Sequence, residues 1–210
     1  MRWAGRVALL VAIASPAALG AQVRGLAVIN SGFGTGSAIS ADVGFGNAAA
    51  GSGTTFGATA SASMGVIGVS GSVSRGSGDV AEADAVWSQA LALTMRLFGG
   101  PLIPFRVTLQ GGVGRWGQGI VETVHVPVSL GLAAVIPNPA FAIRPWLAPR
   151  VDYQSTTFEN SDVNRTELGL SGGIELGFLN GLTIRSAYDR VFTDGNPGIF
   201  SLGLGFTLGR

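Results

Sequence analysis

His125 is the single histidine of this chain and the first residue to weigh for catalysis. Ser129 follows it by four residues and Glu122 precedes it by three. A serine nucleophile needs its hydroxyl within hydrogen-bond reach of the imidazole. On a strand, residues four apart share a face but lie about 13 Å apart, at ~3.3 Å per residue. His125 and Ser129 therefore cannot form a nucleophile–base pair, although His125 with a serine on a neighbouring strand stays open.

Metal and cofactor chemistry find little support in the residue types. With one His and no Cys, the chain has no set of soft ligands at metal-binding spacing. Residues 32–36 are glycine-rich, but they lack both the Lys of a phosphate-binding loop and a following helix. We expect no catalytic residue, no metal and no cofactor.

Most other charged residues share one phase of an alternating pattern, whose remaining positions are largely Gly, Ala, Ser or Thr. Alternate residues of a strand lie on one face, so these charges would face the same enclosed interior. Enclosed charges are costly unless they are paired. We therefore predict a mutually neutralising network. Its members are Asp42, Arg96, Arg106, Arg144, Arg150, Asp152, Arg165, Glu167, Glu175, Arg185 and Asp189.

The elements that carry these residues are ten predicted strands. Each is about as long as a tilted strand that crosses a bilayer, roughly 9–11 residues or slightly more. Short connections alternate with longer ones rich in Gly, Asn, Asp and Glu, which is typical of outer-membrane barrels with short periplasmic turns. Barrels of 8 or 12 strands are the alternatives. The predicted strands are 37–46, 54–63, 66–75, 85–98, 104–116, 122–136, 140–154, 165–178, 182–192 and 199–208.

The opposite phase of these strands is apolar, and its aromatic residues gather at the strand ends. Between the ends this phase is largely aliphatic, which predicts a lipid-facing band between two aromatic girdles. A soluble β-sandwich would have no reason to sort aromatics in this way. The predicted periplasmic girdle contains Phe105, Phe141, Phe178 and Phe206, and the extracellular girdle contains Phe45, Phe56, Trp87, Tyr153, Phe192 and Phe200.

Composition agrees with a membrane barrel. Mean hydropathy is +0.43, yet no apolar run after residue 20 is long enough for a transmembrane helix. The chain has 13 Arg, no Lys and 12 acidic residues, so it offers no basic footprint for nucleic acid. Water-facing sheets usually carry Lys on their edges and outer faces.

The N-terminus predicts export. Arg2 and Arg6 precede an apolar run over 7–14, and a small-residue cleavage site ends at Gly20. We therefore divide the chain into a cleaved signal peptide (1–20), a periplasmic lead-in or lumen segment (21–36) and a transmembrane barrel (37–210).

The C-terminal strand carries a recognisable signature. Ser201, Gly203, Phe206 and Leu208 match in order the polar, glycine, aromatic and hydrophobic positions of the assembly signal of bacterial outer-membrane barrels, although Gly209 and Arg210 follow. Residues 37–210 thus resemble the small β-barrel proteins of Gram-negative outer membranes. The resemblance implies an all-β, antiparallel up-and-down barrel in the cell outer membrane, inserted by the barrel-assembly machinery.

The resemblance implies no particular reaction. We expect a non-enzymatic monomer that is structural, surface-interacting or a very narrow, porin-like pore with a charge-paired lumen. An excess of Arg toward the periplasmic half would favour anions in such a pore. The alternative is an outer-membrane hydrolase that acts on lipid or peptide.

Three arginines break the lipid-facing pattern at predicted extracellular strand ends. They are Arg75, Arg115 and Arg190. Near the interface such charges cost only about 0–1 kcal/mol, and Arg suits bidentate phosphate contacts. They are expected either to bind lipopolysaccharide phosphates as a rim or simply to reach into water.

Overall fold

The computed structural model describes residues 23–32, 37–46, 53–77, 85–100, 103–118, 120–158, 161–193 and 198–208. The predicted signal peptide, Gly209 and Arg210 lie outside these residues. No helix in the described part of the chain is long and apolar enough to cross a membrane. The strands are β1 (Ser37–Gly46), β2 (Thr54–Met64), β3 (Ile67–Ser77), β4 (Val86–Phe98), β5 (Phe105–Gln118), β6 (Val121–Ala134), β7 (Ile136–Pro137), β8 (Phe141–Phe158), β9 (Ser161–Phe178), β10 (Leu182–Val191) and β11 (Ile199–Leu208).

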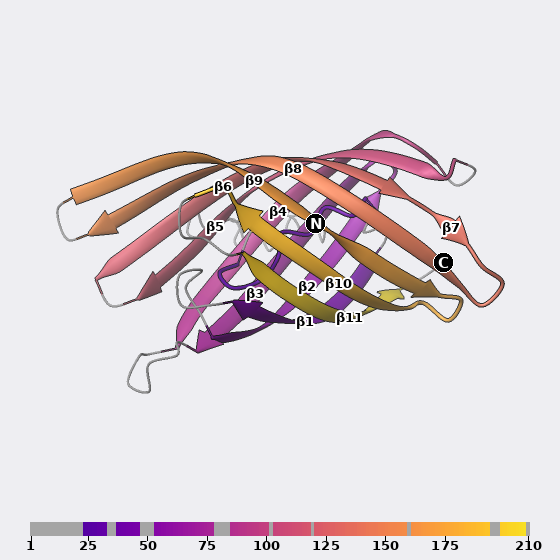
Figure 1. The fold of residues 1–210 in the computed structure, drawn as a ribbon, viewed down its shortest axis with the longest axis horizontal. Coiled ribbons are helices and arrows are strands. Elements are labelled where there is room, and N and C mark those ends of the chain that lie inside the picture. Colours follow the sequence, from indigo (N-terminus) through magenta and orange to yellow (C-terminus); the bar gives the residue numbers. More distant parts are fainter. Residues whose placement is uncertain are drawn as a thin grey trace, which may run out of the picture.

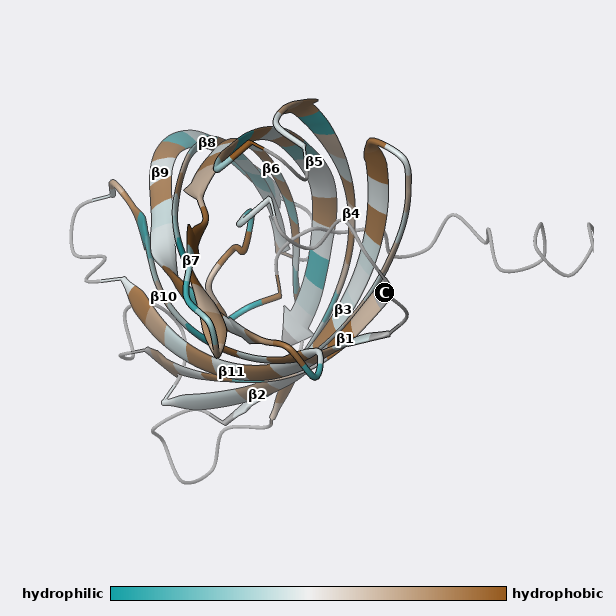
Figure 2. Ribbon diagram, turned by 90° about the vertical axis from the view of Figure 1, so that its right-hand side faces the viewer, coloured by the Kyte–Doolittle hydropathy of each residue, from teal (hydrophilic) through white to brown (hydrophobic). Residues whose placement is uncertain are grey.

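Ten long strands close into an antiparallel barrel (Figure 1). Each strand pairs with its neighbours in sequence, and β1 closes the ring against β11, with Ser37 opposite Leu208. The two-residue β7 continues the line of β6 along β8, where Ile136 lies opposite Ile143. Figure 2 looks along the barrel and shows the closed ring. The predicted ten-stranded up-and-down barrel is confirmed.

The pleat of each strand separates small or polar residues from bulky apolar ones. On β4, Val86, Ser88, Ala90 and Ala92 are buried and face the lumen, while the residues between them are exposed. This alternation has the period of two that a strand imposes on its side chains.

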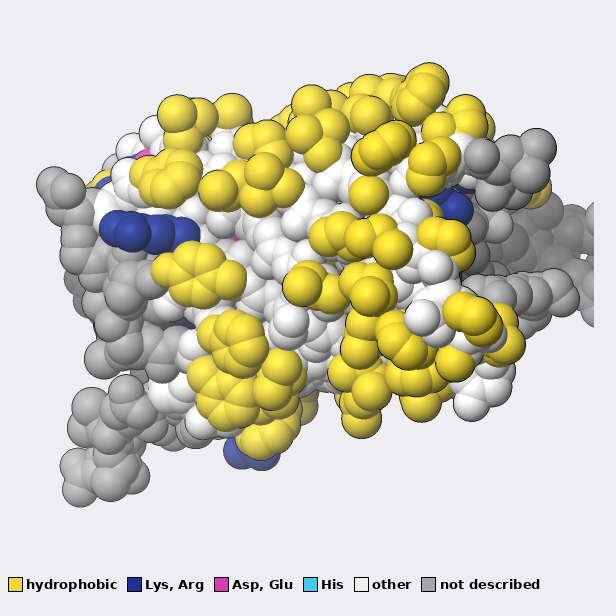
Figure 3. All heavy atoms as spheres, turned by 45° about the vertical axis from the view of Figure 1, so that its right-hand side comes forward, with side chains coloured by type: hydrophobic (Ala, Val, Ile, Leu, Met, Phe, Trp, Pro, Cys, Tyr) yellow, Lys and Arg dark blue, Asp and Glu magenta, His cyan; other side chains and the backbone are white. Residues whose placement is uncertain are grey.

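The outer surface of the barrel is an apolar belt. Figure 3 shows hydrophobic side chains covering much of one face. Eight of the ten aromatic residues predicted for the girdles are exposed, including Phe56 and Trp87 at one end and Phe105 at the other, and the remaining two are half-buried. Phe141 and Phe178 form a cross-strand pair with ring centroids 6.0 Å apart. A belt of this extent is far larger than a water-soluble monomer exposes.

The two ends of the barrel differ in their connections. At one end, tight turns contain Gly65, Gly99 and Gly181, each with a positive φ that glycine adopts without strain. At the other end, longer connections join β1 to β2, β3 to β4 and β10 to β11, while β5–β6 and β8–β9 are joined there by two residues each. In outer-membrane barrels the end with short turns is periplasmic, and we use that orientation throughout.

The extracellular end corrects one boundary. Residues 155–164, predicted as a loop, mostly continue β8 and β9, which reach 18 residues each and meet with Phe158 opposite Ser161. Their side chains are nearly all polar, so sequence alternation fails there. Pairing supplies the order instead, because β6 also follows β8 as far as Val121 opposite Phe158. In Figure 1 this hairpin projects beyond most of the barrel.

Candidate functional site

Residues 23–32 lie inside the barrel, one of the two placements considered for residues 21–36. Val23, Leu26, Ala27 and Val28 are buried against the inner wall. Because this stretch forms no strand of its own, its backbone needs partners from the barrel. The lumen is therefore built around a second piece of chain.

Side chains of the wall supply several of those partners. Ser74 Oγ donates to the Arg24 carbonyl (3.2 Å), and the Ala27 N–H donates to Ser201 Oγ (2.9 Å). Gln110 Nε2 donates to the Ile29 carbonyl (3.3 Å), and Arg106 Nη1 donates to the Gly32 carbonyl (3.2 Å). These contacts come from three strands of the ring, β3, β5 and β11, and hold the segment along the lumen.

Asn30 is the best-satisfied side chain of the segment. Its Nδ2 donates to Ser129 Oγ at 2.9 Å, and its Oδ1 accepts from Thr108 Oγ1 at 2.7 Å. Asn30 is 2% exposed, so loss of either partner would leave a buried polar group unpaired.

Glycines of the wall make room for the segment. A Cβ on Gly44 would overlap the Gly25 carbonyl, and one on Gly57 would overlap the Leu26 side chain. A Cβ on Gly131 would meet Thr108 and Asn30. These glycines are needed where residues 23–32 of the same chain pass close to the wall.

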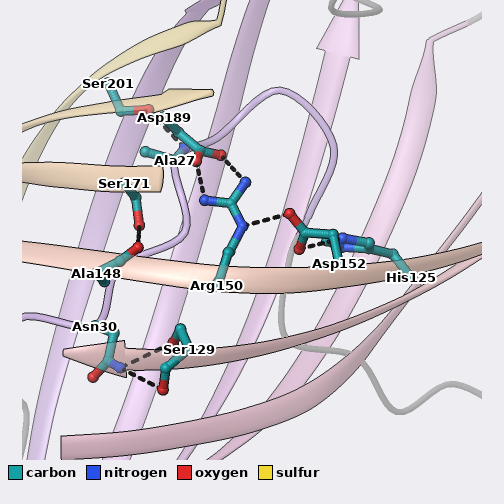
Figure 4. A network of polar contacts seen from close by, with 10 residues as sticks. All are labelled: Ala27, Asn30, His125, Ser129, Ala148, Arg150, Asp152, Ser171, Asp189 and Ser201. Carbon is teal, nitrogen blue, oxygen red and sulfur yellow. Dashed lines mark hydrogen bonds and ion pairs between the residues drawn. The ribbon is translucent and has the colours of Figure 1, made fainter. Parts of the chain in front are cut away.

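Beside the segment lies a buried group of four charged or titratable side chains (Figure 4). Arg150 donates through Nη1 and Nη2 to the two carboxylate oxygens of Asp189, and its Nε donates to Asp152 Oδ2 at 2.7 Å. Asp152 also accepts from His125 Nε2 at 2.8 Å. All four are at most 3% exposed. Arg150 satisfies two carboxylates at once, the arrangement that makes buried charge tolerable.

Two further ion pairs lie nearer the periplasmic end of the lumen. Arg144 Nη1 lies 2.7 Å from Glu175 Oε1, and Arg185 Nη2 lies 2.5 Å from Asp42 Oδ2. Glycine again provides the space, because a Cβ on Gly177 would meet the Arg144 guanidinium and one on Gly203 would meet Asp42 and Arg185.

His125 is held inside the lumen. Its Nε2 contacts Asp152, and its buried Nδ1 has no hydrogen-bond partner among the described residues. No serine hydroxyl of the described residues is therefore within hydrogen-bond distance of this ring. The ring lies inside the barrel beside Trp116, at a centroid distance of 5.9 Å, rather than at the lipid face or rim.

No family model matches the chain, and no curated protein matches it in sequence. Among solved structures it is similar to the beta domain of the Bordetella autotransporter BrkA (TM-score 0.52, 11% identity, 83% of this chain and 100% of that chain). Weaker likenesses, with TM-scores too low to carry an argument, include Ail of Yersinia pestis (0.39, 12% identity, 81% and 96%) and the protease OmpT of Escherichia coli (0.40, 9% identity, 82% and 94%).

The fold is that of a bacterial outer-membrane β-barrel. Together with the apolar belt, this indicates the cell outer membrane. At such low identity the likeness establishes the fold alone and does not decide between enzymes and non-enzymes.

Within this outer-membrane barrel, four predicted network residues fall outside the Arg150 group and the two further ion pairs described above. Arg165 is exposed on the part of β9 beyond the end of β10, so its predicted place in the enclosed network is wrong. Glu167 is half-buried and lies opposite Asp152, a like charge. Arg106 donates to Gly32, and Arg96 Nη2 donates to the Gly65 carbonyl at 3.3 Å.

The three predicted rim arginines are not equivalent. Arg75 lies over the Trp87 ring, 5.7 Å from its centroid, and Arg190 is exposed on the outer face. Arg115 is instead held by Glu122, with Nε 2.6 Å from Oε1 and Nη2 2.8 Å from Oε2. A phosphate would have to compete with that carboxylate at Arg115 alone.

Residues of the C-terminal signature also have lumen contacts. Ser201 accepts the hydrogen bond from Ala27, and Gly203 leaves space for the Asp42–Arg185 pair. Phe206 is exposed on the outer face, as expected for a residue of the periplasmic girdle. The assembly role of these residues stays a prediction.

Sequence reasoning missed Asn30 of the N-terminal segment and the wall residues that contact the segment, among them Thr108 and Gln110. Their types are ordinary for a barrel interior. The available signal was an apolar, non-alternating run at 26–29 together with lumen-phase glycines, which mark positions where a second backbone approaches closely.

Proposed function

We propose that this chain is a non-enzymatic outer-membrane barrel whose lumen is closed and whose longest strands present a surface outside the membrane. The filled lumen is the observation that carries the proposal. Residues 23–32 extend from the extracellular half to the periplasmic end, and the Arg150 group fills space beside them. A cavity of about 150 Å³ remains, lined by the segment itself, by Ser and Thr residues of the wall and by the charged residues Asp42, Glu175 and Arg185.

Against a hydrolase stands the geometry of His125. A Ser–His relay needs the second imidazole nitrogen to face a hydroxyl, and His125 Nδ1 faces none in the described residues. The Asp152 carboxylate that would orient the ring is shared with Arg150. This arrangement supports a structural role for the histidine.

The surface role is supported by strand length. At ~3.3 Å per residue, the 18 residues of β8 or β9 span about 59 Å. A strand tilted by roughly 35–45° needs less than that to cross an apolar band about 25 Å tall. Tyr153 belongs to the extracellular girdle, so the residues after it lie outside the lipid. Those from 157 to 166 that the structure describes are all exposed.

Conductance across a planar lipid bilayer tests the proposal. Refolded full-length protein should insert without discrete current steps under a salt gradient. Current steps from every inserted barrel, with anion selectivity, would instead show that the protein is a narrow pore. Hydrolysis of phospholipid or peptide that disappears in His125→Ala but not in Gln154→Ala would establish the enzyme.

A further inference from the structure

Residues 23–32 have a defined direction inside the lumen. The Arg24 carbonyl is held by Ser74, which lies near the extracellular end of β3. The Gly32 carbonyl is held by Arg106, the second residue of β5 at the periplasmic end. The chain then enters β1 at Ser37, also at the periplasmic end. The N-terminal end of the segment thus points toward the cell exterior.

The lumen holds this segment mainly through its backbone. Carbonyls of Arg24, Ile29 and Gly32 accept from wall side chains, and the N–H of Ala27 donates to Ser201. Such contacts recognise a peptide backbone with little regard to its side chains. Here that backbone turns at residues 23–26 and continues without helix or strand to residue 32. Asn30 adds the sequence-specific contact, because its amide fits between Ser129 and Thr108.

The wall is shaped for a peptide. Gly44 is the clearest position, because all three atoms nearest to an added Cβ belong to Gly25 and Leu26 of the segment. An added Cβ would thus meet the segment before it meets any other part of the described chain. The missing Cβ is explained by the chain that passes it.

We propose that the lumen is a binding site for a peptide, that residues 23–32 of the same chain occupy it, and that the mature N-terminus is directed to the extracellular side. The proposal rests on the closed lumen argued above and adds its ligand and the direction of that ligand. Both ends of the barrel strands, at β1 and β11, remain periplasmic.

Cysteine labelling tests the direction. The chain has no Cys, so a single introduced thiol reports its own side of the membrane. Gln22→Cys stands directly before the segment, Asn164→Cys is an exposed extracellular reference, and Leu179→Cys is an exposed reference in a periplasmic turn. With a membrane-impermeant maleimide, positions 22 and 164 should react in intact cells and position 179 only after permeabilisation. Reaction at position 22 only after permeabilisation would overturn the proposal.

Conductance with an added peptide tests the site. Deletion of residues 23–31 should produce current steps, and a synthetic peptide of residues 21–36 on the periplasmic side should close them, whereas a scrambled peptide should not. If the deletion does not fold, Gly44→Ala should open intermittently where Gly111→Ala, which has open space at its Cβ, stays silent. A native peptide no better than the scrambled one, or a Gly44→Ala barrel as silent as its control, would contradict a peptide site. Conduction by the unmodified chain would instead contradict the closed barrel.

Discussion

At the residue scale, Arg150 shows how the lumen tolerates charge. Its side chain has no exposed surface and contacts Asp152 and Asp189 together. His125 contacts the second carboxylate oxygen of Asp152. Removing one member of such a group strands the others in a poorly solvated interior. The periplasmic pairs obey the same rule with slightly more solvent, since the Arg144 side chain is 15% exposed.

Glu175→Ala should therefore destabilise the barrel. The substitution removes the partner of Arg144, and breaking a buried pair typically costs about 3–5 kcal/mol. Residual solvent at Arg144 places the expected loss toward the lower end of that range. The unfolding midpoint in urea measures it, with Asp162→Ala on the exposed hairpin as the control. Equal midpoints for the two variants would mean that Glu175 is not enclosed.

Lipopolysaccharide binding, which we propose for the outer rim, should depend on Arg75 and Arg190 more than on Arg115. Arg115 is already occupied by Glu122, whereas the other two are exposed on the outer face. Arg75→Gln with Arg190→Gln should reduce the rise in melting temperature that lipopolysaccharide gives, with little change in neutral detergent. Arg115→Gln serves as the comparison. If the double variant gains as much as the parent, the arginines only reach into water.

At the element scale, the sequence predicted the strands in which bulky and small residues alternate. Eight of the ten strands needed shifts of only a few residues at their ends because bulky and small residues alternate along them. The extension of β8 and β9 was missed because Thr157, Asp162 and their neighbours are polar on both faces. There the order comes from pairing, including the 2.8 Å bond from Thr157 Oγ1 to Asp162 Oδ1, and pairing has no local signal.

Shortening that hairpin should leave the barrel intact. Replacing residues 155–164 with Asn-Gly, a pair that favours a two-residue turn, removes only strand that lies beyond the lipid. We expect heat-modifiable migration in gels and a urea midpoint close to the parent. A variant that no longer folds would show that the projecting sheet is part of the barrel's stability rather than a surface it carries.

The C-terminal strand should behave differently. Without residues 206–210, the pairing of β11 with β1 and β10 loses its periplasmic end and the predicted assembly signal. The truncated chain should remain unfolded in the periplasm. Its recovery as a protease-resistant, heat-modifiable barrel in membranes would contradict the role assigned to Phe206 and Leu208.

At the scale of the whole molecule, the sequence predicted the barrel but neither the pairing of its lumen charges nor the segment that fills the lumen. The closed ring follows from ten amphipathic strands, and the network members Asp42, Arg150 and Glu175 follow from their phase. Which charges pair does not follow, because pairing crosses strands far apart in sequence, as Asp42 and Arg185 do. The filling of the lumen was also beyond prediction, since residues 23–32 have no period that marks one face.

The central claim is that the chain closes its own lumen, and a cross-link measures it most directly. Asn30→Cys with Ser129→Cys replaces a 2.9 Å contact by two thiols in a chain that otherwise has none. In outer membranes isolated without reductant, mass spectrometry should find the two positions joined by a disulfide, and Asn30→Cys with exposed Leu179→Cys should not be joined. Free thiols at positions 30 and 129 in the folded barrel, both open to maleimide from the periplasm, would contradict the claim.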